Sequence, residues 1–198
     1  PTPESMLLDE LIEHRVKELT RYKSARYARR YRKEVDAIRA AELPLGGEML
    51  TRAVAVNLYK LMAYKDEYEV ARLYSDGRFA ETLRQTLKGG KSRVWLAPPL
   101  FAAKDEDGKP LKRSYGAFMF KVGFPMLAAM KVLRGTPLDV FGYTAERRTE
   151  RRLVKDYLDA LDAIIQGLTA QRLPIAVKIA AMPDQIRGFG QIKTAAVE

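Results

Sequence analysis

Apolar side chains recur three or four positions apart along most of this 198-residue chain, which is the spacing of helices that bury one face. From Met6 to Ala41 this spacing predicts helix, and the LPLGG run at Leu43–Gly47 ends the pattern. Leu50–Tyr64 contains few polar residues and therefore predicts a central, buried helix whose register continues toward Tyr74. The first half of the chain is thus expected to be helical.

The second half of the chain also shows helical spacing of apolar residues, together with residues that favour the start of a helix. Tyr115–Leu133 is rich in Phe, Met and Ala and predicts a second buried helix, which Pro125 either kinks or begins. Thr144 is placed to cap a long amphipathic helix, because a threonine oxygen can accept a hydrogen bond from a first-turn N–H. Pro174 and Pro183 each suit the first turn of a short terminal helix.

Strand signals are few. Arg93–Leu96 reads as a strand that Pro98 and Pro99 end, and Leu111–Arg113 could return beside it after the Asp107–Gly108 turn. A further amphipathic helix is expected around residues 79–87. The predicted fold is mainly α, an irregular multi-helix domain with at most a small two-stranded β element.

Charge suggests how the chain is organised. It carries 35 Lys and Arg against 25 Asp and Glu, a formal net charge of +10, and residues 15–33 alone hold nine Lys and Arg with a single acidic residue, Glu18. We therefore expect a basic helical arm at residues 1–44, a hinge at the LPLGG run, and a main helical body at residues 45–198. Both parts are expected to belong to one structural unit.

Composition excludes several kinds of chemistry. The chain has no cysteine and one histidine, His14, so thiolate zinc sites, iron-sulfur clusters and a thiol nucleophile are excluded within it. We expect no catalytic, cofactor-binding or metal-binding residues in this chain. Its apolar runs are too short to span a bilayer, and its start lacks the order of a secretion signal. A cytoplasmic location is expected.

Two charged groups stand next to aromatic residues and are candidate contacts with another domain. The first lies in the segment YKDEYEVARLY, and the second begins the long helix after Thr144. The candidate residues are Lys65, Asp66, Glu67, Glu69 and Arg72 in the first group and Tyr143, Arg147 and Arg148 in the second. The alternative is an internal ion network that holds helices together, and the sequence leaves both interpretations open.

Several runs together resemble the C-terminal region of indolepyruvate ferredoxin oxidoreductase in its long form, where the α and β parts are fused. The runs are LDELIEHRVKELTRYKSARYARRYR at residues 8–32, NLYKLMAYKDEYEVARLY at 57–74, LAPPL at 96–100, LRGTPLDVFGYTAERRTER at 133–151 and IRGFGQIK at 186–193. The resemblance covers nearly the whole chain. It implies that the sequence is a piece of a longer polypeptide.

The resemblance implies a parent enzyme that decarboxylates aryl 2-oxoacids oxidatively to acyl-coenzyme A while reducing ferredoxin. Such a parent uses thiamine diphosphate, magnesium, iron-sulfur clusters and coenzyme A. None of this equipment matches positions here, because the chain lacks cysteine and the GDG and NN segments that hold the diphosphate and its metal. The active centre is therefore expected elsewhere, and we expect this chain alone not to be catalytic.

Two functions from different classes follow. The favoured hypothesis is an accessory domain that docks on the catalytic domains of the same polypeptide or on a second protomer, with ferredoxin as a further possible partner and no membrane. The alternative is an independent basic module that binds nucleic acid through the arm, where arginines and tyrosines interleave. We favour the first, because those tyrosines fall at the spacing of a packed helix face.

Overall fold

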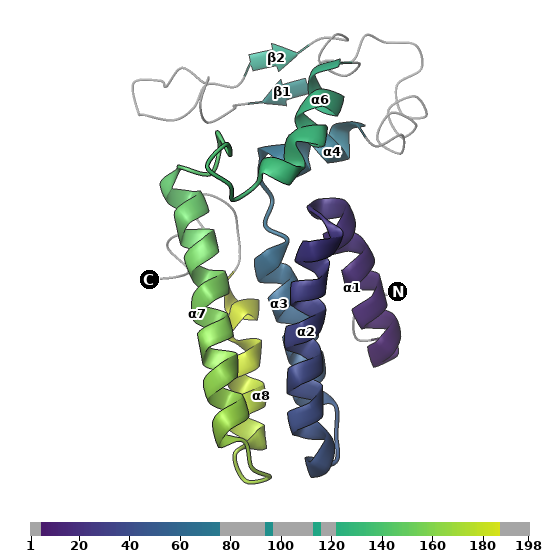
Figure 1. Cartoon of the computed structure of the whole chain (residues 1–198), viewed down its shortest axis with the longest axis vertical. Coiled ribbons are helices and arrows are strands. Elements are labelled where there is room, and N and C mark those ends of the chain that lie inside the picture. Colours follow the sequence, from purple (N-terminus) through teal and green to yellow (C-terminus); the bar gives the residue numbers. More distant parts are fainter. Residues whose placement is uncertain (1–4, 76–93, 97–112, 116–121, 187–198) are drawn as a thin grey trace. The chain divides into compact units, whose positions relative to one another are not determined.

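A computed structural model describes residues 5–75, 94–96, 113–115 and 122–186 of the chain. The expected mainly α fold is confirmed, and Figure 1 shows helices throughout these parts with one small pair of strands. The chain divides into two compact units. Unit 1 comprises residues 1–64 and 144–198, and unit 2 comprises residues 65–143.

Unit 1 contains five α-helices whose buried faces form one core. The helices are α1 (Leu8–Tyr22), α2 (Ala25–Glu42), α3 (Met49–Met62), α7 (Ala145–Gly167) and α8 (Leu173–Ala181), with 3₁₀ turns η1 (Leu43–Leu45) and η4 (Met182–Gln185). Figure 1 shows α1 and α2 as one antiparallel pair and α7 and α8 as another. The central position expected for α3 is confirmed, because Leu50, Val54 and Leu58 are completely buried.

The expected continuous helix from Met6 to Ala41 is broken in the structure. α1 ends at Tyr22, and α2 begins after Ser24, whose hydroxyl accepts a hydrogen bond from the Tyr27 N–H at 3.3 Å. The five-residue step from Tyr22 to Tyr27 in the apolar pattern marks this break. Because a serine cap satisfies first-turn N–H groups, the chain can turn there and fold α2 back along α1.

The expected boundary near residue 44 does not coincide with the boundary between the units. The LPLGG run does end α2, and Gly46 there has a left-handed φ of 73°. However, α2 and α3 on either side contribute to the same core, because Tyr31 and Val35 pack in the cluster that also holds Leu58. The basic segment is therefore part of unit 1, which also includes the residues from 144 onward.

The long helix after Thr144 begins as expected. The Thr144 side chain accepts a hydrogen bond from the Arg147 N–H at 3.3 Å, and Glu146 lies in the first turn, where a negative charge is favoured. Val154, Tyr157 and Leu161 are its buried apolar residues. Pro174 and Pro183 start α8 and η4, as the sequence predicts.

Unit 2 contains α4 (Glu67–Ser75), the strands β1 (Val94–Leu96) and β2 (Arg113–Tyr115), α6 (Phe124–Ala129) and the 3₁₀ turn η3 (Met130–Leu133). The strands pair antiparallel, with Val94 opposite Tyr115. The expected strand pair is thus present, but its second strand lies two residues beyond the expected Leu111–Arg113. Helix α4 is separate from α3 rather than its continuation, since residues 63–66 interrupt the helix.

Of the helix expected at residues 115–133, residues 116–121 lie outside the described part of the chain, and α6 with η3 forms its second half up to Leu133. α6 starts at Phe124 with Pro125 in its first turn, directly after a π-helical stretch at residues 122–123. Phe124 is its one buried residue, and Met126 is exposed. The expectation of a buried helix was therefore wrong for α6. The helix predicted around residues 79–87 lies outside the described residues.

Candidate functional site

The candidate contact residues fall in both units. Those in unit 2 are Lys65, Asp66, Glu67, Glu69, Arg72 and Tyr143, and those in unit 1 are Arg147 and Arg148. Tyr143 and Arg147 of the second group therefore belong to different units.

Asp66 forms a buried ion pair with a residue that sequence reasoning did not single out. Its carboxylate accepts two hydrogen bonds from the Arg134 guanidinium, one of them from Nη2 at 2.7 Å, and both side chains are almost completely buried. Asp66 also accepts the Glu69 N–H at 2.9 Å, which fixes the start of α4. Because a buried carboxylate needs such partners, Asp66 serves the interior of unit 2.

A second buried carboxylate, Asp139, stabilises the turn that follows Arg134. It accepts hydrogen bonds from the Tyr68 hydroxyl at 3.1 Å and from the Gly135 N–H at 2.7 Å. The Phe141 ring packs edge-on against Tyr68, with centroids 5.1 Å apart. A Cβ added at Gly142 would lie 2.6 Å from the Asp139 carboxylate. The RGTPLDVFGY run thus encodes a closely packed turn. In the sequence, the one indication of these buried charges is that Arg134 and Asp139 stand among apolar residues.

The remaining charged residues of α4 lie nearer the surface. Arg72 donates two hydrogen bonds to Glu69, at 2.7 and 2.9 Å, and this pair is partly buried. Burial, followed by the neighbouring Arg72 and Arg134, lowers the pKa of Lys131 below its ordinary value. Lys65 is exposed and Glu67 is half-buried. Of the first predicted group, Lys65 is the member best placed to meet another molecule.

The second predicted group is also divided. Arg147 is buried, forms an ion pair with Glu150 and lies over the ring of Tyr64, 5.5 Å from its centroid. It therefore serves the interior of unit 1. Arg148 is exposed. Tyr143 is exposed too, and its hydroxyl donates to the Pro137 carbonyl at 2.6 Å.

The tyrosines of the basic segment face inward. The hydroxyls of Tyr22, Tyr27 and Tyr31 donate to backbone carbonyls of Tyr64, Met62 and Ala55 at 2.8, 3.0 and 2.8 Å. Burial raises the pKa of Tyr31 well above its ordinary value. Tyr22 and Tyr31 belong to the core of unit 1 and half-buried Tyr27 packs against it, so the buried rings are not displayed beside the arginines as a platform for stacking bases.

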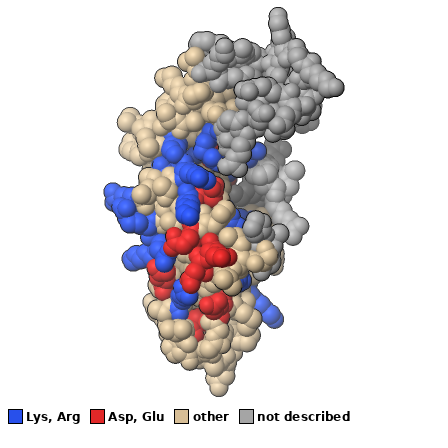
Figure 2. Space-filling model, turned by 90° about the vertical axis from the view of Figure 1, so that its right-hand side faces the viewer, with Lys and Arg blue, Asp and Glu red and all other residues tan. Residues whose placement is uncertain are grey.

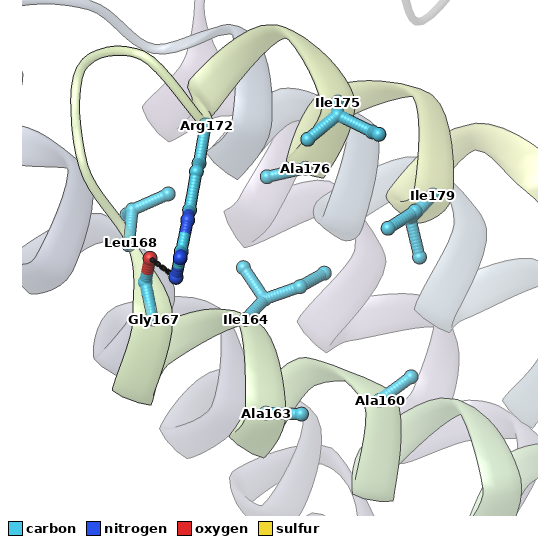
Figure 3. Close-up of a pocket in the computed structure, with 9 residues that line it drawn as sticks. All are labelled: Ala160, Ala163, Ile164, Gly167, Leu168, Arg172, Ile175, Ala176 and Ile179. Atoms are coloured by element: carbon cyan, nitrogen blue, oxygen red, sulfur yellow. Dashed lines mark hydrogen bonds between the residues drawn. The ribbon is translucent and has the colours of Figure 1, made fainter.

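Unit 1 has an apolar groove between the end of α7 and α8, with a volume of about 310 Å³ (Figure 3). Its lining residues are Ala160, Ala163, Ile164, Gly167, Leu168, Arg172, Ile175, Ala176 and Ile179. Arg172 is the one charged residue among them, and its Nη1 donates to the Gly167 carbonyl at 3.2 Å. The sequence did not predict this groove. Its two walls are α7 and α8, and the spacing of apolar residues does not show how the loop between these helices sets one against the other.

The outer wall of this groove belongs to an apolar stripe on α8 and η4. Ile175, Ile179 and Met182 are 59%, 37% and 57% exposed, and they follow one another at spacings of four and three residues. Such a spacing places side chains on one helix face. The stripe and groove together form an apolar surface suited to covering by another protein surface.

Within the described ranges, no three His, Cys, Asp or Glu side chains lie close enough together to hold a metal ion. No helix of these same ranges is long and apolar enough to cross a membrane.

Comparison with known proteins gives one result. The sequence model of a family described as a family of unknown function (DUF6537) matches residues 8–198. No curated protein matches the chain, and no solved structure does so either.

Proposed function

We propose that this chain, which belongs to the family of unknown function DUF6537, is an accessory helical domain of a cytoplasmic 2-oxoacid:ferredoxin oxidoreductase. It docks on the catalytic domains of the same polypeptide. The parent would decarboxylate indolepyruvate or related 2-oxoacids, with thiamine diphosphate, magnesium, iron-sulfur clusters and coenzyme A supplied outside this chain. The resemblance of five runs, spread from residue 8 to residue 193, supports the assignment to this enzyme class.

The apolar surface on α8 is the observation that supports docking. Ile175 and Met182 each expose more than half of their surface to water. Fully burying such a side chain stabilises a complex by about 1.5–3 kcal/mol, so covering the exposed part of each contributes on the order of 1 kcal/mol. The groove beside them would accept side chains from the partner. Arg172 at its end offers one polar contact that can orient the partner.

The residues of this chain do not fit the cofactors of the parent enzyme. An iron-sulfur cluster is held by cysteine thiolates, and the 198 residues include no cysteine. The buried carboxylates Glu42, Asp66 and Asp139 are occupied by backbone and side-chain donors within their own units. No chemical step is therefore assigned to this chain, and its contribution is a folded surface.

The complete polypeptide that carries this sequence provides the test of enzyme class. Purified with its cofactors, it should reduce ferredoxin when indolepyruvate and coenzyme A are present, whereas the isolated 198-residue chain should not. Absence of 2-oxoacid-dependent ferredoxin reduction in the complete polypeptide would refute the assignment.

Docking is tested by placing a charge in the α8 stripe of the complete polypeptide. Ile175→Glu should lower turnover or loosen assembly by about tenfold, because a carboxylate would have to be desolvated in the contact. Leu43→Glu is the matched control, since Leu43 is also exposed but lies in η1, directly after α2, and does not line the groove. Equal behaviour of the two variants, measured by size-exclusion chromatography and turnover, would remove the docking role from α8.

A further inference from the structure

The first half of α2 carries a dense set of positive charges. Residues 21–33 contain seven Lys and Arg residues and no Asp or Glu. Four of them, Arg26, Arg29, Arg30 and Lys33, are exposed on α2. Their spacings of three, four and seven residues place them on one face of the helix, which we call the basic stripe.

The basic stripe differs from the other cations of this segment in its partners. Arg32 forms ion pairs with Glu13 and Asp36, and Arg21 forms one with Glu18. In contrast, none of the four stripe residues forms a hydrogen bond or ion pair with any part of the chain that the structure describes. The ion pairs of Arg21 and Arg32 thus do not involve the four residues of the stripe.

This arrangement opposes folding locally. Like charges three and four residues apart repel each other by about 0.2–0.5 kcal/mol per pair, and the four residues make four such pairs. An anionic partner would relieve this repulsion and would also be attracted over a Debye length of about 8–10 Å. The charges of the stripe therefore do not stabilise unit 1 by itself, but they would contribute favourably to the free energy of binding an anionic partner.

We propose that the basic stripe of α2 binds an acidic patch on a protein partner. The interaction is separate from the proposed docking through α8, since the stripe lies on a different helix and uses charge rather than apolar area. Seven residues of helix rise about 10 Å, so the stripe matches carboxylates that repeat over two turns of an acidic helix. Arginine suits this role, because its guanidinium can bind a carboxylate through two parallel hydrogen bonds.

Two observations favour an acidic protein over nucleic acid. Tyr22 and Tyr31 are buried and Tyr27 is half-buried, and all three hydroxyls are bonded to backbone carbonyls, so the stripe offers charge with little surface for stacking bases. In addition, carboxylates border the stripe: Glu34 and Asp36 follow it directly on α2. A continuous row of phosphates extending along the helix would meet these negative charges, whereas a compact acidic patch would not.

On the face drawn in Figure 2, Asp and Glu side chains gather in the middle, and Lys and Arg side chains lie above and to the left of them with a few in between. A partner whose charges follow the opposite pattern would be oriented as well as attracted, because mismatched placements bring like charges together.

The experiment measures binding of a fluorescent helical peptide with Glu at positions i, i+4 and i+7 to the full 198-residue chain by anisotropy. The test variant is Arg26→Gln/Arg30→Gln/Lys33→Gln. The control, Arg152→Gln/Lys155→Gln/Lys178→Gln, loses the same three charges from exposed positions on α7 and α8. Glutamine is a good helix former, so both variants should keep the helical circular dichroism of the parent chain.

At about 50 mM salt the peptide should bind the parent chain and the control alike and the test variant about tenfold more weakly. The parent's affinity should fall as salt rises to about 200 mM. Equal weakening in both variants would reduce the effect to net charge and overturn the proposal, as would absence of binding to the parent chain at low salt. A random-sequence DNA duplex that binds the parent more tightly than the peptide does, and loses this binding in the test variant, would assign the stripe to nucleic acid instead.

Discussion

Glu42 lies at the end of α2 with its side chain completely buried, and its carboxylate organises the start of the next helix. It accepts hydrogen bonds from the Leu50 and Thr51 N–H groups at 2.8 Å each and from the Thr51 hydroxyl at 2.6 Å. These backbone groups belong to the first turn of α3, where N–H groups have no partner within the helix. A residue eight positions upstream thus does the work of a helix cap.

Removal of this carboxylate should destabilise unit 1 strongly. Glu42→Ala leaves buried donors without an acceptor, so we expect the free energy of unfolding to fall by about 3 kcal/mol, measured by urea denaturation. Glu42→Gln keeps one acceptor oxygen and should cost less. The control is Glu48→Ala, because Glu48 occupies the cap position of α3 without making a side-chain cap bond and should change stability by less than about 0.5 kcal/mol. A larger effect at Glu48 would show that the cap position itself stabilises α3.

At the scale of the element, helix ends decide how the segments of unit 1 turn. Ser24 and Thr144 start α2 and α7 with side-chain hydrogen bonds, and Pro174 starts α8 with the φ that a first helical turn requires. Gly46 ends η1 with a φ of 73°, a conformation that an L side chain rarely adopts. These local signals are visible in the sequence, which is why the starts of α7 and α8 could be predicted.

The two adjacent glycines after η1 should respond differently to substitution. Gly46→Ala should lower the free energy of unfolding by about 1 kcal/mol, because the new side chain must adopt the left-handed φ although space around it is open. Gly47 has no left-handed φ, and a Cβ there would lie 3.8 Å from Glu42 Oε1. Gly47→Ala should therefore be neutral within about 0.5 kcal/mol. Equal thermal midpoints for the two variants would contradict the conformational explanation.

At the scale of the whole molecule, unit 1 is assembled from two stretches of chain separated by the 79 residues of unit 2. Residues from α7 and α8, such as Tyr157 and Ala180, belong to the same core as Tyr31 and Leu58. The Tyr157 hydroxyl donates to the Ala180 carbonyl at 2.8 Å, which ties α7 to α8. The described contacts that form this core all come from within unit 1.

Unit 1 should consequently fold without unit 2. Replacing residues 65–143 by a flexible Gly/Ser linker should preserve a cooperative thermal transition and the helical circular dichroism of α1–α3, α7 and α8. The matched experiment truncates the chain after residue 64, which removes α7 and α8 and should abolish the cooperative transition. A linker variant that melts without cooperativity would show that unit 2 is needed for the core of unit 1.

The sequence by itself determined the mainly α class, the central position of α3, the cap of α7 and the start of α8. Periodicity and caps depend on residues within a few positions of each other, so they can be recognised without knowing the fold. It also predicted charged clusters at Asp66 and Arg147, and left open whether they face a partner or the interior.

Only the tertiary structure decided which distant residues those charges meet. Asp66 pairs with Arg134, 68 positions away, and Arg147 lies over Tyr64, so both charges are used inside their units. The structure likewise decided that the basic segment shares one core with α7 and α8, and that an apolar groove forms where those two helices turn. These features depend on how helix faces pack, and helical periodicity fixes which face is apolar but not which other face will cover it.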